Sequence, residues 1–211
     1  MKAGDTFITF NWDLTLERAL EDNAKNPSFG YSYPPNSSDD ESVTLLKPHG
    51  SVDWYRKTDL PQKKLKGRVQ TLDESVSVFT RFDFSEIPEM ANCTPVIVPP
   101  VAAKDFSHDI LKRTWQGVYR AVSRATDLYI FGYSLPKEDQ FARLVLGRAL
   151  RSNNLKSGKK NKLPLRVVVV NPDETAETTF RRLWGGDEFP RCIGASHAGG
   201  RALAEALRTR L

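Results

Sequence analysis

Three short segments of this 211-residue chain carry residue types that could do chemistry. They are Thr9-Phe10-Asn11-Trp12-Asp13, Lys47-Pro48-His49-Gly50-Ser51 and Gly132-Tyr133-Ser134-Leu135-Pro136. The first and third directly follow apolar runs that are typical of buried strands. In open α/β sheets, ligands bind at the carboxyl ends of the strands, because loop amides and helix N-termini are exposed there. The three segments, in this order, therefore predict one nucleotide pocket.

Asn11 and Asp13 are the polar residues of the first segment. Asn is depleted in buried strands, so an amide at a strand end favours a role in orienting a water molecule or a ribose hydroxyl. Asp13 precedes a helical run, 14–24, and has two interpretations. It is either a ligand-binding carboxylate or the N-cap of that helix, which accepts a backbone N–H.

His49 is the candidate general base, because histidine exchanges protons near neutral pH. Its neighbour Gly50 permits the close approach of a ligand. The alternative is structural, since a histidine at a turn is usually solvated or supports the turn. Short extended segments at 43–46 and 52–55 flank this turn.

Gly132, Ser134 and Asn171 follow two later strand-like runs. Gly132 would let the backbone approach a ligand, and Ser134 would donate its hydroxyl to a phosphate or ribose. Asn171 would bond a ribose or the edge of an adenine ring. Each segment also has a structural alternative. The first is then an ordinary strand-to-helix turn, and in the second Asp173 caps the helix that follows.

The apolar runs predict the elements that must position these residues. Strands are expected at 6–10, 96–98, 128–131 and 165–170. Four consecutive valines, 167–170, do not alternate with polar residues, which fits a strand covered on both faces of a parallel sheet. Apolar residues spaced by three and four predict helices between 110 and 122 and between 141 and 150. The fold class is α/β: a Rossmann-like parallel sheet with flanking helices.

The chain is long enough for one domain over 1–211. Turn-rich residues at 26–40 and weak patterning over 60–91 predict a small irregular insert, 26–94, that carries His49. An amphipathic helix is expected over 199–207.

Composition limits the function classes. The net charge is +5, and the basic residues cluster in two polar loops, 57–68 and 156–162, which we interpret as solvated. Nucleic-acid binding stays an alternative, although no helix-turn-helix, zinc-finger or aromatic-basic motif supports it. No apolar run reaches the length of a membrane span, and the first residues are not a secretory signal. Only two cysteines, Cys93 and Cys192, exclude a four-cysteine zinc site in this chain. We expect no metal and a reducing, cytoplasmic setting.

Four segments together resemble the sirtuin-like domains of bacteria, most closely the branch found in anti-phage defence proteins. They are 9–13, 47–51, 132–139 and 170–173. The resemblance implies NAD as the ligand, with Asn11 and His49 as the catalytic pair and Asp13 on the nicotinamide-ribose side. The expected cofactor-binding residues are Thr9, Gly132, Ser134 and Asn171.

Two features of that family are not found in this sequence. Its opening strand and glycine-rich loop have no counterpart before Thr6, and the zinc-ribbon cysteines of deacylating sirtuins are absent. We therefore expect a sheet that is incomplete at its N-terminal side, and a homo-oligomer or a partner segment that pairs with it. The expected activity is hydrolysis of NAD to nicotinamide and ADP-ribose in prokaryotic defence. The alternatives are an inactive domain that binds NAD or ADP-ribose or acts as a scaffold, and an NAD-dependent protein deacylase.

Overall fold

The computed structural model describes residues 4–23, 29–30, 43–60, 69–72, 74–79, 93–100, 108–157, 165–173 and 175–184. The chain forms two compact units. The first comprises Met1–Pro99 and Ala103–Gly117, and the second comprises Pro100–Ala102 and Val118–Leu211. The helix expected over 199–207 lies outside the described residues, and the boundaries of the expected domain and insert stay a prediction. No helix in the described part of the chain is long and apolar enough to cross a membrane.

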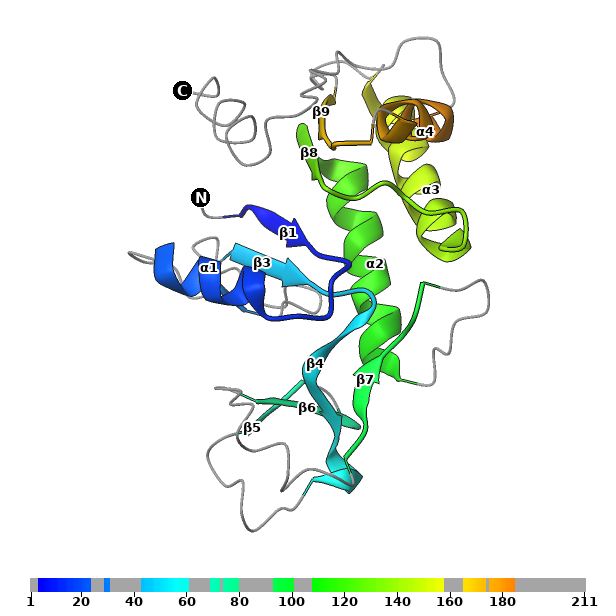
Figure 1. Ribbon diagram of the computed structural model, residues 1–211. Helices are drawn as coiled ribbons and strands as arrows, with labels where there is room; N and C mark the ends of the chain where they lie inside the picture. Colours follow the sequence, from blue (N-terminus) through cyan, green and yellow to red (C-terminus); the bar gives the residue numbers. More distant parts are fainter. Residues whose placement is uncertain are drawn as a thin grey trace. The chain divides into compact units, whose positions relative to one another are not determined.

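The first unit contains a parallel sheet of three strands in the order β1-β3-β2. Figure 1 shows β1 beside β3. The strands are β1 (Thr6–Ile8), β2 (Phe29–Gly30) and β3 (Val43–Leu46). β3 pairs in parallel with both neighbours, so that Thr6 lies opposite Thr44 and Ile8 opposite Leu46. The predicted strand at 6–10 is thus confirmed in its first three residues, and Thr9 and Phe10 belong to the loop that leads to α1 (Thr15–Asn23).

The same unit contains an antiparallel sheet in the order β5-β6-β4-β7. Its strands are β4 (Gly50–Arg56), β5 (Val69–Thr71), β6 (Val76–Phe79) and β7 (Pro95–Ile97), and the 3-10 helix η1 (Lys57–Asp59) follows β4. The strand expected at 96–98 is therefore present, but it pairs with β4 in an antiparallel arrangement. A buried cluster joins this sheet to the start of α2 (Asp109–Arg124): Trp54, Val76, Val78, Val96, Val98, Ile110 and Leu111.

The long helix α2 confirms the prediction from the spacing of its apolar residues. Ile110, Leu111, Trp115, Val118 and Val122 are all buried, as positions three, four and seven apart on one face should be. Residues up to 117 belong to the first unit and the rest to the second.

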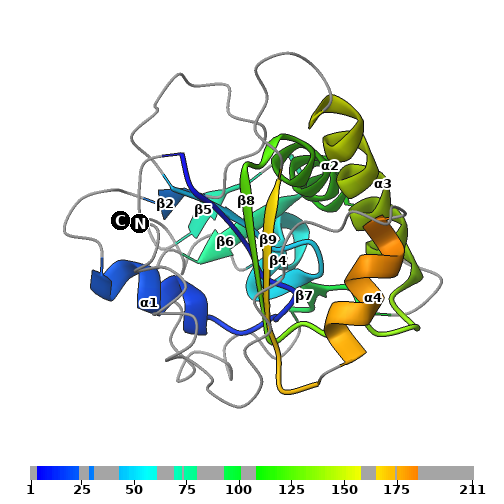
Figure 2. The ribbon, with the colours of Figure 1, turned by 90° about the horizontal axis from the view of Figure 1, so that it is seen from above.

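The second unit is built on two parallel strands, β8 (Asp127–Phe131) and β9 (Arg166–Val170), which lie side by side in Figure 2. Leu128 lies opposite Val167. All four valines of β9 are buried, as expected for a strand covered on both faces. The helices α3 (Gln140–Ser157) and α4 (Thr175–Trp184) pack together, and a Cβ added at Gly147 of α3 would contact Leu183 of α4. Parallel strands alternating with helices give the Rossmann-like α/β fold that the sequence predicts.

Candidate functional site

The loops that follow β1 and β3 are joined to each other. Because these strands are parallel neighbours, both loops leave the same edge of the sheet. The carbonyl oxygen of Trp12 accepts hydrogen bonds from the backbone N–H of Val52 at 3.0 Å and from the hydroxyl of Ser51 at 3.3 Å. The ammonium group of Lys47 donates to the carbonyl oxygen of Asp13 at 2.6 Å. These hydrogen bonds therefore hold the segment that carries Asn11 against the segment that carries His49.

His49 is buried at a tight turn between β3 and β4, with an exposed fraction of 2%. The turn is closed by the backbone N–H of Gly50, which donates to the carbonyl oxygen of Lys47 at 3.0 Å. The imidazole packs edge-on against Phe10, with ring centroids 5.3 Å apart, and lies 5.8 Å from the ring centroid of Trp115. Two aromatic rings thus hold the imidazole beside the loop of Asn11.

Asn11 and Thr9 shape the loop after β1. The side chain of Asn11 is exposed, and its backbone N–H donates to the hydroxyl of Thr9 at 3.2 Å. The backbone N–H of Thr9 donates in turn to the carbonyl oxygen of Leu46 at the end of β3. The amide of Asn11 therefore projects from a loop that is fixed at its base.

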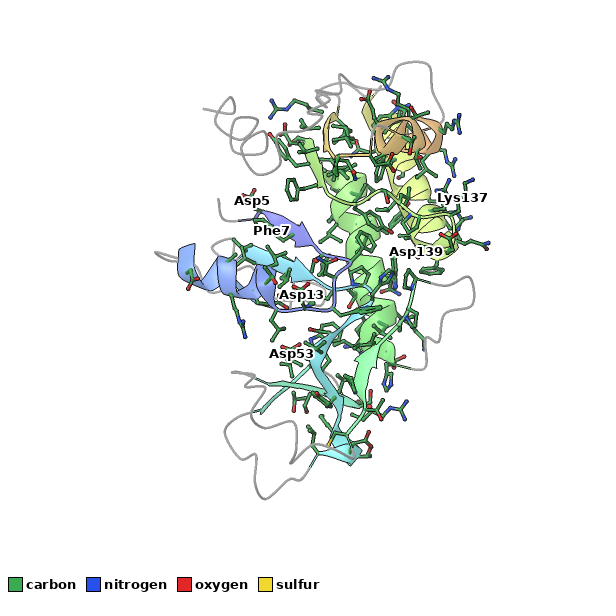
Figure 3. All side chains as sticks on the ribbon, viewed as in Figure 1. Asp5, Phe7, Asp13, Asp53, Lys137 and Asp139 are labelled. Carbon is green, nitrogen blue, oxygen red and sulfur yellow. The ribbon has the colours of Figure 1, made fainter. Side chains whose placement is uncertain are left out.

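Asp13 is exposed and lies at the start of α1 (Figure 3). Its Oδ1 accepts the backbone N–H of Thr15 at 2.9 Å, and this hydrogen bond lowers the pKa of Asp13. The carboxylate of Asp13 thus supports the start of α1, as the structural interpretation predicts, but not from the N-cap position itself. The first helical carbonyl is that of Leu14, which accepts from Arg18, so Asp13 lies one residue before the cap.

The close approach at Gly50 involves the protein's own backbone. Gly50 has φ +79°, and a Cβ built on it would lie 1.9 Å from the carbonyl oxygen of Val96. The glycine is therefore required by β7 packing against the turn. The sequence suggested that Gly50 makes room for a ligand, whereas in the structure it makes room for the backbone of Val96.

In the second unit, Gly132 and Asn171 lie together at the carboxyl ends of β8 and β9. The backbone N–H of Gly132 donates to the carbonyl oxygen of Val170 at 2.9 Å. Gly132 has φ +67°, and a Cβ built on it would meet no heavy atom of the described residues within 4 Å. Asn171 is buried and accepts the backbone N–H of Asp173 through Oδ1, while its buried Nδ2 finds no acceptor among the described residues. This edge of the second unit combines an open glycine with an unsatisfied amide donor.

The loop between β8 and α3 carries the exposed Ser134 and is held by buried groups. Asp139 is fully buried and accepts the Tyr133 hydroxyl at 3.0 Å and the backbone N–H of Ala142 at 3.2 Å. Burial and the neighbouring Asp139 raise the pKa of Tyr133 above its usual value. Leu135 has φ +57°, an uncommon conformation for a residue with a side chain, and Arg143 donates to its carbonyl oxygen at 2.9 Å. These contacts fix the loop in a strained conformation.

With this geometry established, the comparisons decide the family. The family model of the SIR2-like domain matches residues 5–185. The protein belongs to the SIR2-like family. Members of this family use NAD. Neither the curated proteins nor the solved structures contain a significant match.

Sequence reasoning missed three buried charged residues of this SIR2-like domain. Lys47 is fully buried and forms an ion pair with Glu17 of α1 at 2.5 Å. Asp53 of β4 is also buried, and burial raises its pKa to about 6 despite a hydrogen bond with Ser51 and the charge of Lys47 (Figure 3). The signal in the sequence is a lysine placed directly after the apolar run 43–46, where a solvated charge would not be expected.

The described part of this SIR2-like domain shows no metal site. Among the described residues, no three His, Cys, Asp or Glu side chains are grouped so that they could hold an ion. Asp173 supports the start of α4 as Asp13 supports the start of α1: its Oδ1 accepts the backbone N–H and the hydroxyl of Thr175, the first residue of the helix.

Proposed function

We propose that this SIR2-like domain hydrolyses NAD to nicotinamide and ADP-ribose. The observation that carries the proposal is the joining of the two loops in the first unit, which places the Asn11 segment and the His49 turn at one edge of the parallel sheet. Loops at the carboxyl ends of parallel strands are the usual ligand sites of such folds. An exposed amide, a carboxylate and an imidazole are gathered there from distant parts of the sequence.

The reaction breaks the bond between the nicotinamide nitrogen and the ribose C1′, and forms a bond from a water oxygen to C1′. The transition state resembles an oxocarbenium ion, as in other glycosidic cleavages. We assign Asn11 to hold the water and His49 to take the proton that the water loses. Asp13, whose pKa is lowered, is ionised at neutral pH and would stabilise positive charge on the ribose. General-base assistance contributes about 10²- to 10⁴-fold to the rate.

For the second unit we propose contacts with the adenosine part of NAD. The buried Nδ2 of Asn171 would gain an acceptor, and the open face of Gly132 would allow the ligand near the backbone. Ser134 is exposed on the same loop and would donate its hydroxyl. Thr9, in the first unit, is retained as a proposed cofactor contact.

A second candidate function is binding of NAD or ADP-ribose without turnover. Two observations favour it: His49 is 2% exposed, and the carboxylate of Asp13 already supports the start of α1. We further propose that the protein acts in the cytoplasm, in prokaryotic anti-phage defence. This part of the proposal is supported by the sequence resemblance.

We also propose that the protein pairs with a second copy or with a partner segment. Within the described residues, β1 lies at the edge of its sheet, with β3 as its neighbour on one side. Exposed edge strands readily pair with another strand.

The test is chromatography of NAD incubated with the purified protein, with and without an acetylated peptide. The hydrolase predicts nicotinamide and ADP-ribose in equal amounts without peptide. Asn11→Ala should lower the rate at least tenfold, and Asn154→Ala, an exposed Asn on α3, should leave the rate unchanged. Nicotinamide release only with the peptide would indicate a deacylase. A protein that binds NAD but releases nothing would be the binding domain.

A further inference from the structure

Lys47 is an unusual residue for its position because its ammonium group is entirely enclosed. It follows β3 directly and stands two residues before His49. A buried ammonium group is costly unless it is paired and hydrogen-bonded. Its carboxylate partner is Glu17, whose side chain is 8% exposed and belongs to α1.

The ion pair does not account for everything that Lys47 contacts. Its Nζ also donates to the carbonyl oxygen of Asp13 at 2.6 Å. An ammonium group has three donor hydrogens and can satisfy both partners at once. One side chain thus connects the end of β3, the loop after β1 and the first turns of α1.

We propose that Lys47 is a positioning residue of the site, and that its bond to the Asp13 carbonyl sets the Asn11 loop against the His49 turn. The proposal rests on the proposed function for its catalytic meaning. The loop has other links to that turn, through the carbonyl oxygen of Trp12, but these reach Ser51 and Val52 on the far side of His49. On the β3 side, the backbone N–H of Thr9 fixes the start of the loop to the carbonyl oxygen of Leu46, and the contact with Lys47 fixes its end, beyond Asn11.

If Lys47 only stabilised the fold, its contribution would come from the ion pair with Glu17 and not from the hydrogen bond to the carbonyl oxygen of Asp13. The two roles are separable, because a buried ion pair can often be replaced by two apolar side chains without loss of stability. Removing one partner alone leaves an uncompensated buried charge. An apolar replacement of both Lys47 and Glu17 removes the charges together, and it also removes the donor to Asp13.

The experiment compares the parent protein with Lys47→Met, Glu17→Gln and the double variant Lys47→Met/Glu17→Met. Each is measured by thermal melting, by amide hydrogen exchange of the peptide that covers 9–15, and by the Kd and kcat for NAD. Lys47→Met alone should melt at a lower temperature. The double variant should regain most of that loss, yet show at least tenfold faster exchange in 9–15 and at least tenfold lower kcat, with Kd changed less than threefold.

Glu17→Gln is the matched control, because it breaks the ion pair and keeps the donor to Asp13. It should retain slow exchange in 9–15 and most of the kcat. A double variant that regains the melting temperature, the slow exchange and the kcat would overturn the proposal, since the ion pair would then be the whole role of Lys47. Loss of cooperative melting in this double variant and in Lys47→Leu/Glu17→Leu would overturn it as well. A parent without NAD turnover would refute the proposed function, while the exchange rates would still decide the role of Lys47.

Discussion

The α-carbon of Gly50 lies against the backbone of Val96 so closely that a Cβ atom on residue 50 would be 1.9 Å from the Val96 carbonyl oxygen. Two residues further along the chain, directly after β7, the backbone N–H of Val98 donates to the carbonyl oxygen of His49 at 2.8 Å. The antiparallel strand β7 thus packs against the turn that carries His49 and fixes it from one side. Contact between two backbones leaves no room for adjustment by a side-chain rotation.

Gly50→Ala should destabilise the protein by about 3 kcal/mol or more. The left-handed φ costs a residue with a Cβ roughly 1–2 kcal/mol, and the clash with Val96 adds strain that only a backbone shift relieves. Gly132→Ala is the matched control, since Gly132 also has a positive φ but no described residue lies within 4 Å of a Cβ built on it. It should cost only about 1 kcal/mol. Urea denaturation of both variants measures the difference, and equal losses would contradict the geometry at Gly50.

Asp53 should make the stability of the protein depend on pH. Its pKa in the folded protein is about 6, raised from 3.8 by burial, with Lys47 lowering it and Glu17 raising it further. The folded state therefore holds a proton on Asp53 that the unfolded state releases at lower pH. This contribution to stability is fully present below pH 3.8 and is lost as the pH rises through 6.

The measurement compares the free energy of unfolding of the parent and of Asp53→Asn between pH 4 and pH 7. Asn stays neutral throughout, so the parent should lose roughly 2–3 kcal/mol relative to the variant across this range. A constant difference between the two proteins would show that Asp53 does not titrate in this window.

Asp139 should matter more for stability than Asp173, although both accept the backbone N–H groups of a helix start. Asp139 is fully buried and also accepts the hydroxyl of Tyr133, whereas Asp173 is exposed. Asp139→Ala should cost about 2–4 kcal/mol, because it leaves buried donors unsatisfied. Asp173→Ala should cost about 1 kcal/mol, the usual value of a cap. Denaturation midpoints that rank the two variants in the opposite order would refute this assignment.

The parts of the fold that follow from local pattern could be predicted from the sequence. The unbroken valines of β9 indicated a strand covered on both faces, and the spacing from Ile110 to Val122 indicated α2. The spacing of apolar residues reflects the local structure of the chain, so a single sequence is enough to predict these elements. The partner with which a short strand pairs, in contrast, depends on residues that are distant in the sequence. The strand near Val96 was foreseen, but its antiparallel partner β4 is selected by packing in the core around Trp54.

The candidate site was predictable in its polar residues and not in what positions them. Asn11 and His49 stood out because polar types at strand ends are informative. The ion pair between Lys47 and Glu17 joins residues 30 positions apart, and neither has a spacing that indicates the other. The positive φ of Leu135 could not be predicted either, since leucine gives no local signal for this backbone conformation.

The role of His49 as the base is tested by nicotinamide release from NAD by the parent protein, by His49→Ala and by His108→Ala. His108, beside the start of α2, is the control because it is not part of the proposed site. We expect release by the parent and by His108→Ala at similar rates, and a rate at least 100-fold lower for His49→Ala in a protein that still melts cooperatively. Release by His49→Ala at the parent's rate would show that His49 is not the base.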